Sequence, residues 1–151
     1  MALAEAMRED EKAQLIAVMG TAGFDPDTAV QWMVNTWAES APFALTVVGS
    51  DGMPAAAGGF HPVAPGVWQA WMAGTEPGWA QQWRAMTKAT RWMIDRLLET
   101  HAHRVQASAI TSRVKAIEWF ERSLGMRPEG VWRSFGIRGE DIAHFSRLRG
   151  E

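Results

Sequence analysis

The order of the central strands is decided by residues 67–110, whose sequence is VWQAWMAGTEPGWAQQWRAMTKATRWMIDRLLETHAHRVQASAI. Residues 67–73 and 104–110 are short, mostly apolar runs, and both predict strands. Between them, residues 79–100 repeat apolar side chains at helical spacing, after a break at 74–78 that contains Gly and Pro. Because a strand, a helix and a strand in succession form a crossover unit, the two strands should run parallel in one sheet. The sequence therefore predicts a parallel strand pair.

On the N-terminal side of this unit, two helices and an antiparallel meander are expected. Residues 7–19 carry apolar side chains at helical spacing, and Asp25-Pro26 is typical of a helix start, with Asp25 as the N-cap. Residues 43–48 then follow a period of two, which predicts a strand, and residues 55–60, AAAGGF, are interpreted as a second strand of small residues. Ser50-Asp51-Gly52 between them is a hairpin turn, since Asp-Gly tolerates the positive φ that such turns need.

On the C-terminal side, a helix and a final hairpin are expected. Ser112 is a suitable N-cap for a helix that runs to Leu124 and ends at Gly125. Residues 131–137 and 142–148 predict two strands. The fold class is therefore α+β, and residues 1–151 form a single domain around a mixed sheet.

The composition narrows the chemistry that the chain can perform. The 151 residues are 47% hydrophobic and 21% charged, so they can bury a core. The absence of Cys excludes disulfides, thiolate zinc sites, iron–sulfur clusters and a cysteine nucleophile. The four His residues form no close pair beyond His101 and His103, so we expect no metal site. No apolar run reaches the roughly 18 residues of a membrane span, and no signal peptide is visible, so a cytoplasmic location is expected.

The net charge of −2 is divided unevenly along the chain. Residues 1–79 hold nine acidic and two basic side chains, whereas residues 80–151 hold eight acidic and thirteen basic ones. A basic half suggests an anionic partner, although an inert dipolar surface explains it equally well. With a pI near 6.1 and no dense Lys/Arg run, a nucleic acid is the partner that the sequence favours least.

Residues 114–126, VKAIEWFERSLGM, resemble the segment of GNAT-type N-acetyltransferases in which a helix of the pattern A-I-x-x-aromatic-E-x-x-L-G-aromatic ends at a Gly. Residues 127–148 resemble the closing hairpin of that superfamily, and the expected order of elements is also similar. Within the superfamily, the chain looks most like small GNAT-like proteins encoded by tailed phages. The resemblance implies a GNAT-like domain whose mostly antiparallel sheet contains one splayed parallel pair and is flanked by helices.

The same resemblance implies that acetyl-CoA binds between the splayed strands, with its pyrophosphate on the N-terminus of the intervening helix. Physically, a helix N-terminus offers free N–H groups and the positive end of a dipole. Gly78-Trp79-Ala80 is the nearest match to the family's phosphate loop, and Arg84 is the first cation beyond it. The cofactor contacts implied are Met72, Ala73, Thr75, Gly78, Trp79, Ala80, Arg84, Arg113 and Phe120.

Three positions depart from the family pattern. Glu76 would repel a pyrophosphate, Arg113 stands where the family has Asn, and Phe120 stands where the family has a Tyr that protonates the leaving thiolate. Candidates for a catalytic role are His61 as a base, Glu76 as a base, and Ser108 as a hydrogen-bonding group. Each also has a plain structural interpretation, as a turn His, a solvated loop acid and a strand Ser.

The tryptophans around the expected phosphate loop, Trp68, Trp71, Trp79 and Trp83, either line an acceptor pocket or pack in the core. The function favoured by the resemblance is acetyl transfer from acetyl-CoA to a primary amine on a small molecule or a protein. The alternative is a catalytically degenerate phage or prophage protein that binds a virion or host protein during assembly. The sequence leaves the oligomeric state open, with a homodimer as one option.

Overall fold

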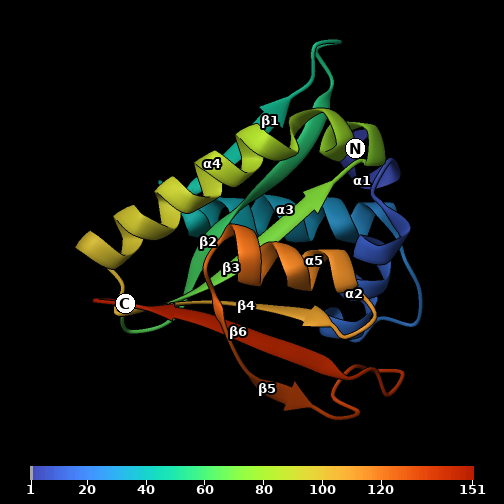
Figure 1. Cartoon of the computed structure of the whole chain (residues 1–151). Coiled ribbons are helices and arrows are strands. Elements are labelled where there is room, and N and C mark those ends of the chain that lie inside the picture. The colour runs from blue at the N-terminus through green and yellow to red at the C-terminus, as the bar shows by residue number, and fades with distance from the viewer. Residues whose placement is uncertain (1) are drawn as a thin grey trace.

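A six-stranded mixed sheet forms the centre of the computed structural model, which describes residues 2–151 (Figure 1). Its strands lie in the order β1-β2-β3-β4-β6-β5. The strands are β1 (Ala44–Val48), β2 (Pro54–Ala64), β3 (Val67–Gly74), β4 (Arg104–Ile110), β5 (Arg127–Trp132) and β6 (Ile142–Leu148). The helices are α1 (Ala2–Glu5), α2 (Glu9–Met19), α3 (Pro26–Ser40), α4 (Glu76–Thr100) and α5 (Val114–Glu118), and α5 continues as a π-helical turn, Trp119–Ser123.

The parallel pair is the feature that organises the sheet. Strands β3 and β4 pair in parallel only at their first residues, where Val67, Trp68 and Gln69 face Arg104, Val105 and Gln106. Beyond Gln69, β3 continues to Gly74 and β4 continues to Ile110 without further pairing, so the two strands splay apart. All other neighbouring strands are antiparallel. The predicted α+β fold with one splayed parallel pair is therefore confirmed.

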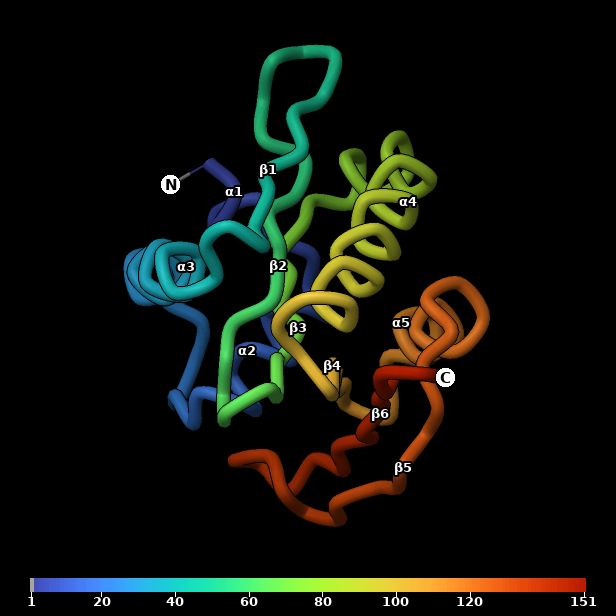
Figure 2. The backbone as a smooth tube through the Cα atoms, turned by 90° about the vertical axis from the view of Figure 1, so that its left-hand side faces the viewer, coloured from blue at the N-terminus to red at the C-terminus, as the bar shows by residue number. Residues whose placement is uncertain are grey.

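Helices cover both faces of the sheet (Figures 1 and 2). Helices α4 and α5 lie on one face, where Ile94, Leu97 and Val105 are fully buried in the larger core cluster. Helices α1, α2 and α3 lie on the other face, where Ala29 and Trp71 belong to a second core cluster. The sheet therefore separates two cores, and the splay is the place where a passage between the faces can form.

Local capping signals explain where the helices begin. The Asp25 carboxylate accepts a hydrogen bond from the Thr28 N–H at 2.8 Å, which confirms the predicted start of α3. In α4, the Thr75 hydroxyl accepts from the Gly78 N–H at 3.0 Å, so the helix begins at Glu76 and not at residue 79. Residues 74–78 were expected to be a break, but most of them form the first turn of α4 because Pro77 is well tolerated there.

The predicted helix over 112–124 is corrected at its start. Arg113 is the residue at the N-cap position of α5, and Ser112 makes no capping hydrogen bond. The helix then widens into its π-helical turn, which the Leu124 N–H closes by donating to the Trp119 carbonyl at 3.0 Å. Gly125, with a φ of 68°, ends the helix as expected.

The final hairpin is also corrected. Strand β6 has the predicted bounds, but its partner β5 is Arg127–Trp132 and not residues 131–137. Residues 133–141 form a loop, because the N–H groups of Phe135 and Gly136 donate to the Glu140 carbonyl and thus close a turn. Phe135 and Ile137 alternate as residues of a strand would, but both side chains are exposed on this loop.

Among residues 2–151, no helix has the length and apolar character to cross a membrane. Within the same range, no group of three or more acidic or His side chains lies close enough together to hold a metal ion.

Candidate functional site

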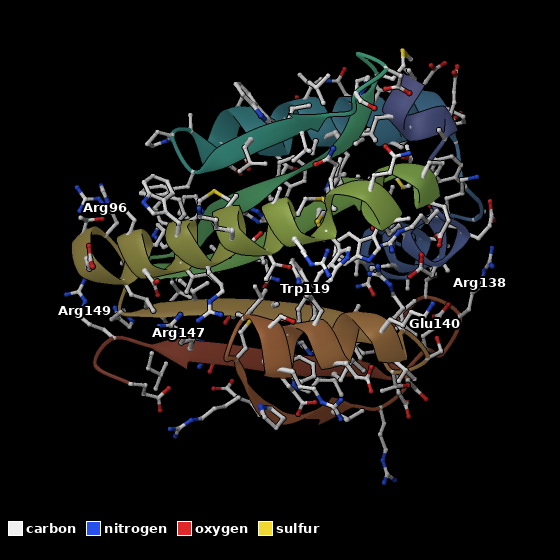
Figure 3. The ribbon with its side chains drawn as sticks, turned by 45° about the horizontal axis from the view of Figure 1, so that its top comes forward. Arg96, Trp119, Arg138, Glu140, Arg147 and Arg149 are labelled. Carbon is white, nitrogen blue, oxygen red and sulfur yellow. The ribbon has the colours of Figure 1, made fainter. Side chains whose placement is uncertain are left out.

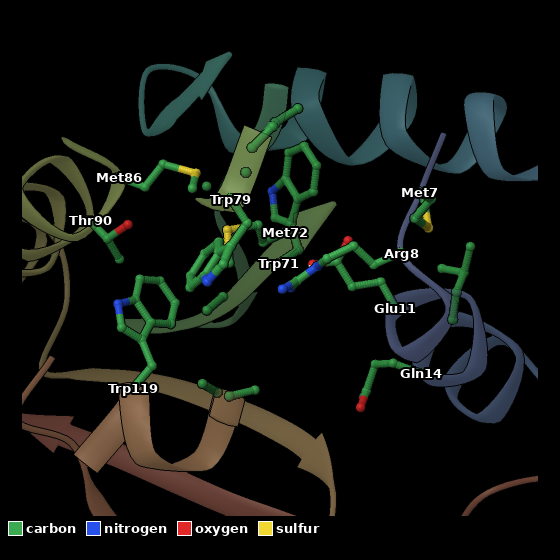
Figure 4. A pocket seen from close by; sticks show the side chains of 18 of the residues that line it. Met7, Arg8, Glu11, Gln14, Trp71, Met72, Trp79, Met86, Thr90 and Trp119 are labelled. Carbon is green, nitrogen blue, oxygen red and sulfur yellow. The ribbon is translucent and has the colours of Figure 1, made fainter. Parts of the chain in front are cut away.

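A cavity of about 970 Å³ passes through the splay and reaches both faces of the sheet (Figure 4). On the face of α4 and α5, its walls include Met86, Thr90 and Trp119. On the opposite face, its walls include Gln14 and His61. The cavity is therefore continuous from one side of the sheet to the other, and residues of the splayed strands β3 and β4 line it.

The free edge of β3 faces this cavity. The Thr75 N–H donates to the Ala55 carbonyl on β2, whereas the Gly74 N–H donates to the other side. Because successive backbone groups of a strand alternate in direction, the N–H and carbonyl of Met72 must also face the splay. Met72 lines the cavity. The splay therefore presents an unpaired backbone donor and acceptor in the middle of the sheet.

Helix α2 closes the wide end of the splay by hydrogen bonding to both strands. The Glu11 carboxylate accepts from the Gly74 N–H at 2.6 Å, and the Gln14 side-chain oxygen accepts from the Ile110 N–H at 2.7 Å. These two side chains lie one turn apart, so they reach β3 and β4 from the same side of the helix. Backbone groups at the mouth of the splay are thus satisfied, while those deeper inside are left open.

Glu11 is also the centre of a buried ion cluster. Arg8 pairs with Glu11, and the Arg113 guanidinium lies 3.7 Å from Glu11 and 3.1 Å from Asp10. Burial raises the pKa of the Glu11 carboxyl, while Arg8, the Gly74 N–H and Arg113 act in the opposite direction. The cluster joins the N-terminal segment, the end of β3 and the start of α5.

Two tryptophans bridge α4 and α5 over the cavity. The rings of Trp79 and Trp119 meet edge to face at 5.2 Å, and the Trp119 indole N–H donates to the Thr87 hydroxyl at 2.8 Å. Figure 3 shows Trp119 pointing towards α4 from the π-helical turn that continues α5. Arg8 lies over the Trp79 ring at 4.9 Å from its centroid, so the ion cluster and the tryptophan pair are in contact. Phe120 follows Trp119, is buried and also lines the cavity.

His61 lies on the opposite face, beside the point where the splay begins. It pairs with Gln69 across β2 and β3, and Gln69 is the last residue of β3 that pairs with β4. The Nδ1 atom of His61 is buried and has no hydrogen-bond partner among the described residues. Burial lowers the pKa of His61, and the Glu39 carboxylate opposes this only in part. The imidazole is therefore neutral at neutral pH, and its Nδ1 atom is enclosed by protein.

The structure brings together part of the predicted site. All three catalytic candidates, His61, Glu76 and Ser108, line the cavity. Of the nine residues expected at the cofactor, four line it: Met72, Trp79, Arg113 and Phe120. The remaining five, which lie outside its walls, are Ala73, Thr75, Gly78, Ala80 and Arg84.

Gly78 and Arg84 lie outside the cavity for different structural reasons. The Gly78 N–H is occupied by Thr75, and a Cβ on Gly78 would lie 2.5 Å from the Ala55 carbonyl oxygen, so this glycine packs against β2. Arg84 lies on the outer face of α4, where its guanidinium stacks over Trp83. Among the four tryptophans considered from the sequence, Trp71 and Trp79 line the cavity, whereas Trp83 is 40% exposed.

The sequence did not reveal the contributions of α2 or of Trp119. Glu11, Gln14 and Trp119 looked like ordinary helix residues, and the partners of α2 on the strands are 63 and 96 positions away. Of these residues, only Glu11 carried a usable sequence signal. An acidic residue on the core-facing side of a helix predicts a buried hydrogen-bond or ionic partner.

The sequence matches no protein-family model and no curated protein. Solved structures, however, superimpose on nearly the whole chain. An acetyltransferase of the GNAT family from Bacillus anthracis is 16% identical, with a TM-score of 0.68 over 99% of this chain and 91% of that chain. A GCN5-related N-acetyltransferase from Brucella melitensis is 20% identical, with a TM-score of 0.69 over 99% of this chain and 69% of that chain.

A third structure was solved with acetyl-CoA bound. It is a GNAT-superfamily phosphinothricin acetyltransferase from Sinorhizobium meliloti, 13% identical, with a TM-score of 0.66 over 99% of this chain and 85% of that chain. The chain therefore has the fold of the GNAT-family acetyltransferases.

Proposed function

We propose that the protein transfers an acetyl group from acetyl-CoA to a primary amine. The observation that carries this proposal is the unpaired edge of β3 at Met72, which faces a cavity open to both faces of the sheet. A donor can then approach from the side of α4 and α5 while an amine approaches from the opposite side. Direct transfer between two bound molecules needs no nucleophile on the protein, which suits a chain without Cys.

The residues around the splay fit the acyl end of such a donor. Acetyl-CoA, when bound, supplies a thioester that is open to attack by an amine. The Met72 N–H is the backbone group able to donate to the acyl oxygen, where negative charge develops during the reaction. Met86 and Trp119 provide apolar walls for the arm that carries the acyl group. We propose that the phosphate end lies near Trp79 on the cavity side of α4, whereas Ala80 and Arg84, which the resemblance implied as contacts, lie outside that cavity.

His61 is proposed as the proton acceptor on the amine side. The amine nitrogen forms the new C–N bond as the C–S bond breaks, and His61 takes the proton that the nitrogen gives up. Its lowered pKa suits this role, because the imidazole is neutral at pH 7. Ser108 lines the same cavity and is proposed to orient the amine. Phe120 has no proton to give, so the departing thiolate takes its proton from water.

The proposal is tested by measuring thiol release from acetyl-CoA with a panel of primary amines. His61→Gln should lower kcat/KM by roughly a hundredfold or more at pH 7. In the wild type, kcat/KM should fall at low pH as His61 becomes protonated, and the variant should lack this fall. His103→Gln, at an exposed His, is the matched control and should leave the profile unchanged. An unchanged pH profile in His61→Gln would remove His61 from this role.

A second candidate function is supported by the neighbourhood of α4's first turn. Thr75 occupies the Gly78 N–H, Glu76 places a negative charge beside it, and Glu11 occupies the Gly74 N–H. These features suit a GNAT fold without a cofactor, acting as a phage or prophage assembly or interaction protein. Calorimetric titration distinguishes the two functions: no heat with millimolar acetyl-CoA would support the interaction protein. Binding at 100 times the Kd should raise the unfolding free energy by about 2.7 kcal/mol and would support the enzyme.

A further inference from the structure

The outer face of α4 carries a second hollow, of about 450 Å³, that is separate from the cavity at the splay. All of its walls come from α4 itself. We call the part formed by Trp83, Arg84, Lys88, Arg91 and Trp92 the basic aromatic face.

The charge of the basic aromatic face is not neutralised by neighbouring side chains. Arg84, Lys88 and Arg91 are all exposed, and within residues 2–151 none of them forms an ion pair. The one acid that lines the hollow, Asp95, is 2.8 Å from Arg147 of β6 and is therefore balanced by a cation outside the face. Figure 3 shows Arg147 beside α4. Three cations thus remain for an anionic partner.

The two tryptophans of this face are unusually exposed, at 40% for Trp83 and 64% for Trp92. They are nine residues apart, which corresponds to about 13.5 Å along a helix and to opposite edges of the face. The three cations lie between them along α4. Arg84 stacks on Trp83 at 4.9 Å, so this indole already holds a planar cation in place. The result is a basic stripe with an aromatic ring at each end.

We propose that the basic aromatic face of α4 binds single-stranded nucleic acid. A single strand alternates phosphate charges with planar bases, and groups of both kinds meet complementary side chains here. An acidic peptide would satisfy the cations but would leave both indoles exposed to water. The overall pI argues against a nucleic acid, yet binding depends on the local charge, and here three cations lie close together on one helix face. This inference does not rest on the proposed acetyl transfer.

The test is fluorescence anisotropy with a labelled twelve-nucleotide oligo-dT and oligo-U at several salt concentrations. The double variant K88A/R91A should weaken binding at least tenfold and should lower the slope of log affinity against log salt by about 0.7 for each lost phosphate contact. Trp92→Ala should weaken binding roughly five- to a hundredfold with little change in that slope, because stacking is lost while charge is kept. Arg84 is left unchanged so that its stacking contact with Trp83 stays intact.

Arg133→Ala is the matched control, since Arg133 is exposed on the loop after β5 and forms no ion pair among the described residues. It should bind the oligonucleotides as the wild type does, and circular dichroism melts should show that all variants remain folded. The proposal is wrong if the wild type shows no binding at low salt, or if Arg133→Ala loses as much affinity as K88A/R91A. It is also wrong if polyglutamate competes as well as the oligonucleotide, or if acetyl-CoA competes and K88A/R91A loses acetyl-CoA binding as well.

Discussion

Glu129 of β5 shows how a single side chain fastens an edge strand. Its carboxylate accepts hydrogen bonds from both terminal guanidinium nitrogens of Arg104 on β4 and from the Ser146 hydroxyl on β6. Because β6 lies between β4 and β5, this ion pair crosses the intervening strand. The hydrogen bond with Arg104 and the one with Ser146 lower the pKa of Glu129 to about 2.

Glu129→Gln should lower the free energy of unfolding at pH 7 by about 0.5–1 kcal/mol, the size of a partly exposed pair after screening by water. A carboxyl whose pKa is lowered in the folded state contributes stability above its unfolded pKa and loses it as the pH falls through the folded value. The difference from wild type should therefore shrink from about pH 4.5 towards pH 2. Urea denaturation at pH 7, 4.5 and 3 measures it, with Glu118→Gln as a surface control. An equal loss at pH 3 would contradict the ionic explanation.

The first turn of α4 packs closely against β2 because residue 78 is a glycine. Gly78 is buried, and a Cβ there would approach the Ala55 carbonyl oxygen to 2.5 Å and the Ala55 Cβ to 2.6 Å. The resemblance had implied that this glycine belongs to a phosphate loop. The structure gives it a packing role, because it lets the first turn of α4 approach β2 closely.

Gly78→Ala should therefore destabilise the protein by about 1–3 kcal/mol, since backbone atoms of β2 cannot move aside cheaply. Helix propensity alone predicts the opposite, a gain of about 1 kcal/mol. Thermal or urea unfolding distinguishes the two signs. Gly23→Ala is the matched control, because no atom lies within 4 Å of a Cβ at that glycine. A stabilised Gly78→Ala protein would show that α4 can shift away from β2 without penalty.

At the scale of the whole molecule, the ion cluster around Glu11 connects three parts of the chain. It joins α2 to the end of β3 and to the start of α5, so it holds the mouth of the splay at a fixed width. Glu11→Ala would leave Arg8 and Arg113 partly buried, with the more exposed Asp10 as their remaining acidic partner.

We expect Glu11→Ala to lower the free energy of unfolding by about 3–5 kcal/mol, the usual cost of breaking a buried pair on one side. Glu9→Ala, at a highly exposed acid that pairs with Lys12, should cost less than about 1 kcal/mol. Urea denaturation of both variants at pH 7 provides the comparison. Similar losses in the two proteins would mean that the cluster does not hold the splay together.

The accuracy of the sequence-based predictions depended on how local each signal was. The Asp25 cap, the bounds of β6 and the parallel pair were predicted correctly, because each depends on neighbouring residues or on a general connection rule. Ser112 and residues 131–137 were wrong, because the same patterns also occur where no helix cap or strand forms. The closure of the splay by Glu11 and Gln14 could not be predicted, since it depends on where α2 lies relative to distant strands.

The unpaired edge at Met72 also reverses the usual distribution of amide protection in a sheet. Central strands ordinarily exchange their amide hydrogens with solvent most slowly, and edge strands exchange them fastest. Here the Met72 N–H lies in the middle of the sheet but has no partner strand, while the neighbouring Ala73 N–H faces β2. Exchange should therefore alternate sharply along β3, fast at Met72 and slow at Ala73. A molecule that binds in the splay should shield the Met72 amide from water. Slower hydrogen exchange at Met72 would therefore report directly that the splay is occupied.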